Sequence, residues 1–68
     1  MNKDIIKGNW QQIKGQLKQT WAKFTDDEIL AMQGNYDELV GTLQKKYGYQ
    51  KDKAKTEVDR FIQQNQWQ

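Results

Sequence analysis

The residues with the clearest binding chemistry are lysines near the start of the chain. Four of them share one side of the expected first helix: Lys3, Lys7, Lys14 and Lys18. They fall within an arc of about 60° if that helix begins early and turns about 100° per residue. Such a basic strip suits a polyanion, either nucleic acid or an anionic membrane surface. The alternative is a solvated flank whose lysine stems cover the edges of the Trp10 and Trp21 indoles.

Nucleic acid is therefore a candidate partner, but a weak one. If all four lysines met phosphates, log K would fall with log salt at a slope of only about −3.6. Binding is expected to be independent of base sequence and largely lost near physiological salt.

Catalytic and metal-binding residue types are scarce. The chain contains no Cys, His or Ser, which removes the usual nucleophile and base pairs, disulfides, and thiolate or imidazole metal sites. Asp26 and Asp27 are paired carboxylates, but acid–base work needs a sheltered cleft that shifts their pKa values. A fold this small leaves little room for one, and carboxylates there also suit the first turn of a helix. We expect no enzyme activity, no metal site and no cofactor.

Length and composition limit the architecture that can position these residues. With 68 residues, the chain forms one domain over residues 1–68, and a domain this short is marginally stable. Its mean hydropathy is −1.15, but 12% aromatic residues and the absence of Pro favour a fold over disorder. The longest apolar run is Ile29–Met32, far short of a membrane span. The first residues do not resemble a signal peptide, so we expect a soluble, cytoplasmic protein.

Apolar residues recur at steps of three and four, which predicts helices. The first helix runs to about Lys23. It begins either near Lys3 or near Trp10, because Gly8–Asn9 suits both an interior turn and a cap.

Three further helices are expected. Thr25 and Glu28 form a capping box for a short second helix. The third helix lies between Asn35 and Gly48, and the fourth begins near Gln50. The connections are short, so consecutive helices should fold back as hairpins. The prediction is an all-α, compact four-helix domain built of two packed helical hairpins.

The two hairpins show signs of an internal repeat. At an offset of 26 residues, these pairs match: Gly8-Asn9-Trp10 with Gly34-Asn35-Tyr36, Ile13 with Leu39, Gly15 with Gly41, Leu17 with Leu43, and Trp21 with Tyr47. The pattern predicts a pseudo-twofold repeat in which the first and third helices superpose.

The apolar residues that recur along each predicted helix form a stripe on one face, and these stripes predict which residues are buried. The expected core includes Trp10, Ile13, Leu17, Trp21, Leu39, Leu43 and Phe61. Tyr49 and Trp67 lie off the stripes, which suits packing over helix ends or partial exposure. Gly8 and Gly15 project away from the apolar stripe, and each costs its helix about 1 kcal/mol relative to Ala. Either the helix tolerates them, or another backbone approaches there, in the fold itself or in a partner.

The order of several short motifs resembles the CsbD-like family of small bacterial proteins associated with general stress responses. The motifs are Met1-Asn2-Lys3-Asp4, Gly8-Asn9-Trp10-Gln11-Gln12-Ile13-Lys14-Gly15, Trp21-Ala22-Lys23-Phe24-Thr25-Asp26-Asp27 and Tyr47-Gly48-Tyr49-Gln50-Lys51-Asp52. Family members usually have Gly in place of Ala22 and Leu in place of Phe24. The resemblance implies a four-helix fold of two packed hairpins and a link to stress, and it brings no catalytic residues.

Two classes of function remain open. The first is a non-enzymatic role in protein interaction or protection, with an unknown protein partner. The second is weak, sequence-independent nucleic-acid binding through the basic strip, which the salt dependence of DNA binding would separate from the first. Attachment of the first helix to anionic lipid is a weaker third option. The chain is expected to be a monomer.

Overall fold

The computed structural model describes residues 2–67, and within them every regular element is a helix. The helices are α1 (Asn2–Gly8), α2 (Trp10–Thr20), α3 (Asp26–Met32), α4 (Tyr36–Tyr47) and α5 (Lys51–Gln64). The all-α class is confirmed. The expected count of four is wrong, because the predicted first helix is two helices.

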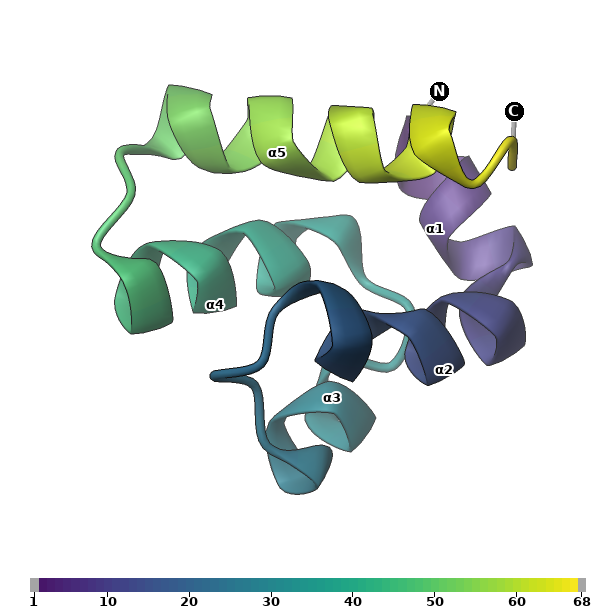
Figure 1. Cartoon of the computed structure of the whole chain (residues 1–68). Helices are drawn as coiled ribbons and strands as arrows, with labels where there is room; N and C mark the ends of the chain where they lie inside the picture. The colour runs from purple at the N-terminus through teal and green to yellow at the C-terminus, as the bar shows by residue number, and fades with distance from the viewer. Residues whose placement is uncertain (1, 68) are drawn as a thin grey trace.

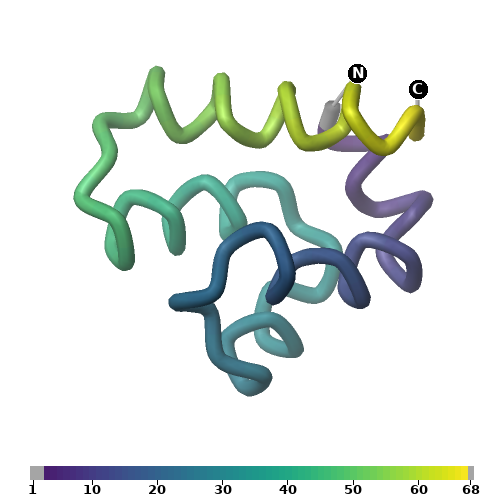
Figure 2. The backbone as a smooth tube through the Cα atoms, in the orientation of Figure 1, coloured from purple at the N-terminus to yellow at the C-terminus, as the bar shows by residue number. Residues whose placement is uncertain are grey.

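The longest helices, α4 and α5, form one antiparallel hairpin (Figure 1). The remaining helices cover this hairpin: α1 packs on α4 and α2, and α3 packs on α2 and α4. The backbone trace shows α1 beneath the carboxyl end of α5, while the turn between α2 and α3 lies below the α4–α5 turn (Figure 2). The arrangement is thus one complete hairpin with three short helices packed around it, rather than two equal hairpins.

Asn9 is where the predicted first helix divides. Its φ and ψ are −113° and 19°, outside the helical range. Its backbone N–H and its side-chain Nδ2 both donate to the Ile5 carbonyl, each at 3.0 Å. Asn side chains compete in this way for backbone acceptors and so weaken a helix interior. Both of the predicted helix starts are therefore found in the structure: Lys3 lies in the first turn of α1, and α2 begins at Trp10.

The predicted helix caps are confirmed. Thr25 and Glu28 form both bonds of a capping box at the start of α3. Asn35 caps α4 by accepting from the Glu38 N–H at 3.0 Å. Gly48 ends α4 in the left-handed conformation at φ 70°, where glycine has no steric penalty.

The core takes side chains from all five helices. Its fully or almost fully buried members are Ile6, Ile13, Leu17, Trp21, Phe24, Ile29, Met32, Tyr36, Leu39, Val40, Leu43, Ala54, Val58, Phe61 and Ile62. Among the expected core residues, Trp10 is only half-buried and packs at the edge of this cluster. The break at Asn9 makes Trp10 the first residue of α2, at the edge of the core. Tyr49 and Trp67 pack half-buried beyond the ends of α4 and α5, as their positions off the stripes predicted.

The 26-residue pattern is matched only locally. Trp10 and Tyr36 are both the first residue of a helix preceded by Asn, and Leu17 and Leu43 are both fully buried. Trp21, however, is buried after the end of α2, whereas Tyr47 is half-buried within α4. Equivalent positions therefore have different surroundings, because α5 is twice the length of α3.

Leu43 should be indispensable for stability. Its side chain has no exposed surface, and Leu→Ala at such sites costs about 2–5 kcal/mol. Leu43→Ala should therefore unfold much or all of this small domain at room temperature, measured by urea titration of the circular dichroism signal. Leu30→Ala, at a residue that is 59% exposed, is the matched control and should unfold nearly as the wild type does. Unfolding of Leu43→Ala at the wild-type urea midpoint would contradict the assignment of the core.

Candidate functional site

The lysines predicted to bind a polyanion are divided between two helices. Lys3 and Lys7 belong to α1, and Lys14 and Lys18 belong to α2, beyond the break at Asn9. The continuous-helix geometry that defined their common arc therefore does not hold across Asn9.

Two of these four lysines already face carboxylates. The Lys3 ammonium lies 3.3 Å from Asp37 on α4, and the Lys18 ammonium lies 2.8 Å from Asp26 on α3. These pairs are exposed, so each contributes little to stability. Each nevertheless places a negative charge beside a cation that was expected to meet phosphate. Lys7 and Lys14 make no ion pair with the residues described.

A groove of about 500 Å³ runs between α2 and α3, and we call it the α2–α3 groove. It is lined by Gln11, Lys14, Gly15, Lys18, Asp26, Ile29 and Leu30. Leu30 is 59% exposed and is the one large apolar side chain exposed to this degree within residues 2–67. The groove thus combines an apolar wall, a floor without a side chain at Gly15, and a basic edge. Leu30 was not predicted as a site residue. The available signal for its exposure was that Ile29 and Met32 are three residues apart on one face of the helix, and Leu30 lies off that face.

Gly15 is not required by the packing of the chain itself. A Cβ atom built at Gly15 would meet no other atom within 4 Å, and the same is true of Gly8. Close approach of another backbone within the fold therefore does not explain these glycines. Tolerance by the helix and approach by a partner's backbone stay predictions. Gly34 differs, because its φ is +74° and a Cβ there would lie 3.4 Å from Trp10.

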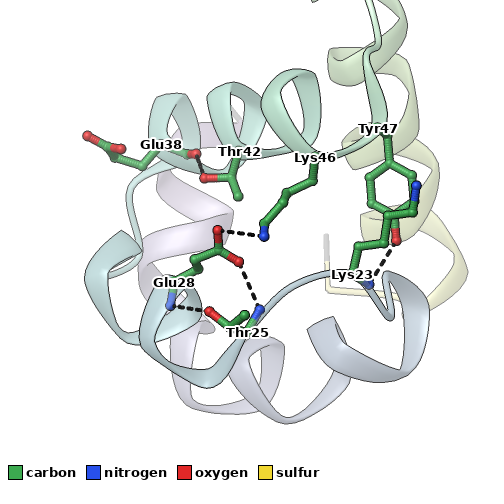
Figure 3. A network of polar contacts seen from close by, with 7 residues as sticks. All are labelled: Lys23, Thr25, Glu28, Glu38, Thr42, Lys46 and Tyr47. Atoms are coloured by element: carbon green, nitrogen blue, oxygen red, sulfur yellow. Dashed lines mark hydrogen bonds and ion pairs between the residues drawn. The ribbon is translucent and has the colours of Figure 1, made fainter.

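Glu28 connects three segments through a network on the other side of α3 (Figure 3). Its carboxylate accepts from the Thr25 N–H at 2.9 Å and pairs with the Lys46 ammonium at 3.0 Å. Both side chains of the ion pair are about three-quarters covered. The backbone bond from Thr25, followed by the bond from Lys46, holds the pKa of Glu28 below its usual 4.5. The network fixes α3 against the end of α4.

One further side chain, Tyr36, has a pKa that departs from its ordinary value. Burial, then the charges of Asp59 and Asp37, raises the pKa of Tyr36 above its ordinary 10.0, so the phenol stays protonated at neutral pH. Within residues 2–67 no group of three or more carboxylates is placed to hold a metal ion. No described helix has the length and apolar character needed to cross a membrane.

The described part of the chain is thus a small assembly of five short helices with an open groove between α2 and α3. It belongs to the CsbD-like family, whose model matches residues 4–56. The UPF0337 protein YjbJ of Escherichia coli O6:H1 is 54% identical over 59 residues, which cover 87% of this chain and 86% of that protein. YjbJ of Escherichia coli K12 is 48% identical over 67 residues, covering 98% and 97%. The UPF0337 protein PA4738 of Pseudomonas aeruginosa is 46% identical over 61 residues, covering 90% and 94%.

The Glu28–Lys46 pair predicts a pH-dependent difference between the wild type and Glu28→Gln. Gln can still accept the capping bond, so the variant loses mainly the ion pair. A carboxylate with a lowered pKa contributes stability above its unfolded pKa, and this contribution disappears as pH falls through the folded value. The thermal midpoint of Glu28→Gln should therefore lie below that of the wild type at pH 7, and the two should converge below 4.5, the usual pKa. A constant gap down to strongly acidic pH would contradict the assigned role.

The open surroundings of Gly15 predict that Gly15→Ala stabilises the protein. Ala is favoured over Gly inside a helix by about 1 kcal/mol, and the new methyl group meets no neighbour within 4 Å. The matched control is Gly34→Ala, which should be destabilising because φ is +74° there. Denaturant unfolding measures both. A destabilised Gly15→Ala protein would show that the fold itself needs this glycine.

Proposed function

We propose that this CsbD-like protein is a non-enzymatic, stress-associated protein that acts by contacting other proteins, in an interaction or protective role. The observation that carries this proposal is the α2–α3 groove, where the exposed Leu30 side chain lies beside the bare backbone of Gly15. An apolar centre bordered by polar side chains is the usual anatomy of a protein contact site. The stress association is supported by the family to which the chain belongs.

The composition of the groove favours a protein segment over a small metabolite. Its walls are apolar at Ile29 and Leu30, and its edge carries the unpaired Lys14 ammonium. A helix laid in the groove could bring its backbone close to Gly15 because no side chain stands there. Recognition of an amphipathic helix by an apolar groove is a recurring mode of protein contact.

A photocrosslinking experiment tests this proposal. A photoreactive amino acid replaces Leu30 in one variant and Thr56, an exposed residue on α5, in a matched control. In stressed cells, discrete crosslinked products are expected from position 30 and not from position 56. Gly15→Leu, which fills the groove floor, should abolish them. Identical products from both positions, or products insensitive to Gly15→Leu, would count against the groove.

Weak, sequence-independent nucleic-acid binding is the second candidate function. It is supported by the lysines without carboxylate partners, among them Lys7 and Lys14 on the predicted strip. The ion pairs of Lys3 and Lys18 reduce the positive charge that the strip presents to a phosphate, because the phosphate must compete with Asp37 and Asp26. Binding through these lysines should be strongest at low salt.

A further inference from the structure

Tyrosine rings and lysines come together at the turn between α4 and α5, on a different surface from the α2–α3 groove. We call this the basic–aromatic corner and define it by Lys23, Tyr47, Tyr49, Lys51 and Lys53. Tyr47 ends α4, Tyr49 lies in the connection, and Lys51 and Lys53 are in the first turn of α5. Lys23 comes from the turn that follows α2.

The two rings and the ammonium groups of Lys23 and Lys53 form one ordered arrangement. The Tyr47 and Tyr49 rings stack with centroids 5.6 Å apart and planes inclined by 23°. The Lys53 ammonium lies 4.6 Å from the centre of the Tyr49 ring, and the Lys23 ammonium lies 5.0 Å from that of Tyr47. The Lys23 backbone N–H also donates to the Tyr47 hydroxyl at 3.2 Å (Figure 3). Both rings are half-buried, so they are fixed and yet accessible.

A hollow of about 590 Å³ opens beside the stacked rings. It is lined by Tyr47, Gly48, Tyr49, Gln50, Asp52 and Lys53. This volume is within the range of sites that hold small organic groups, roughly 300–1,000 Å³, and a nucleobase is such a group.

The corner also carries positive charge that carboxylates do not neutralise. Lys23, Lys51 and Lys53 make no ion pair with any residue the structure describes, unlike Lys3, Lys18 and Lys46. A cation over an aromatic ring keeps its full charge, so two of these lysines combine an ordered position with an unmatched charge. Asp52 is the one carboxylate among the residues that line the hollow.

We propose that the basic–aromatic corner binds single-stranded nucleic acid. One base stacks on the Tyr49 ring in the place now taken by the Lys53 ammonium, and Lys23, Lys51 and Lys53 contact the flanking phosphates. Aromatic platforms combined with basic side chains bind single strands with little sequence preference. A duplex is disfavoured, because its bases are already stacked on one another. This inference rests on the second candidate function, nucleic-acid binding, and moves its site away from the predicted strip.

Fluorescence anisotropy with labelled oligonucleotides at low salt tests the stacking. The probes are oligothymidylate, an abasic oligonucleotide of equal length and charge, and a duplex. The wild type should bind oligothymidylate more tightly than either other probe. Tyr49→Leu should weaken oligothymidylate binding by about 5- to 150-fold and leave the abasic probe unchanged. Tyr49→Phe, which keeps the ring, should bind as the wild type does. Equal affinity of the wild type for oligothymidylate and the abasic probe would overturn the proposal.

A pair of matched double variants tests where the phosphates bind. Lys23→Gln with Lys51→Gln removes two charges from the corner, and Lys7→Gln with Lys14→Gln removes two from the predicted strip. The corner variant should reduce the salt slope for oligothymidylate by about 1.4, while the strip variant should leave it unchanged. The reverse result would overturn the corner and support the strip. Absence of binding by the wild type at low salt would end the nucleic-acid function as well. Thermal unfolding of each variant confirms that it is folded.

Discussion

The contact of Trp21 with Phe24 and Phe61 is the interaction on which the arrangement of the chain depends. Trp21 lies just beyond α2, its ring 5.7 Å from Phe24 and 4.9 Å from Phe61 on α5. In a chain without disulfides, and with no metal cluster within residues 2–67, apolar packing must hold the short helices on the α4–α5 hairpin. Aromatic side chains supply the largest buried area per residue. The turn after α2 is consequently fixed to α5, although 40 residues separate Trp21 from Phe61.

Further rings extend this contact in both directions. Phe61 meets Trp67 beyond α5, and Phe24 meets Tyr47, which stacks on Tyr49. Trp21, Phe24 and Phe61 at the centre of this series are buried, and the rings at its ends are half-buried. The rings at the surface are therefore held in place by rings in the core. The Tyr47–Tyr49 pair is therefore ordered by the same packing that stabilises the fold. A pre-ordered ring loses little entropy when a ligand binds it, which is why the basic–aromatic corner differs from tyrosines merely exposed on a loop.

Helix α3 shows how the remaining surface follows from this core. With seven residues, it is too short to be stable alone. Ile29 and Met32 anchor it in the core, and the capping box and the Glu28–Lys46 pair hold its first turn. Once its buried face is fixed, Leu30 must point outward, beside α2. The α2–α3 groove is a consequence of burying Ile29 and Met32 on so short a helix.

Local signals in the sequence were sufficient for much of this fold. Thr25 and Asn35 predicted helix starts because capping depends on residues within one turn, and Leu17, Leu39 and Leu43 followed from periodicity. The sequence does not decide whether the first helix starts near Lys3 or near Trp10, and it does not predict two helices, because the break at Asn9 depends on whether one side chain bonds to the Ile5 carbonyl.

The candidate sites were harder to predict because they depend on contacts between distant residues. Asp37, which neutralises Lys3, is 34 residues away along the chain. Lys23 reaches the Tyr47 ring from a different turn. A helical projection represents only one helix. It therefore shows neither the ion pairs of Lys3 and Lys18 with other helices nor the approach of Lys23 to the Tyr47 ring.

Three helical glycines have equally open surroundings but lie on different surfaces of the molecule. Gly8, Gly15 and Gly41 are all helical, and a Cβ at any of them would meet no neighbour within 4 Å. In a helix interior, as at Gly15 and Gly41, such a glycine costs about 1 kcal/mol of stability relative to Ala, a substantial fraction for a domain that lacks covalent crosslinks. Simple tolerance would account equally for all three. Of the three, Gly15 lines the groove that the exposed Leu30 also lines, so under the proposed function the missing side chain keeps room for a partner's backbone. Gly41 lines neither the α2–α3 groove nor the hollow beside Tyr49, and tolerance on a helix held by its buried face is sufficient there.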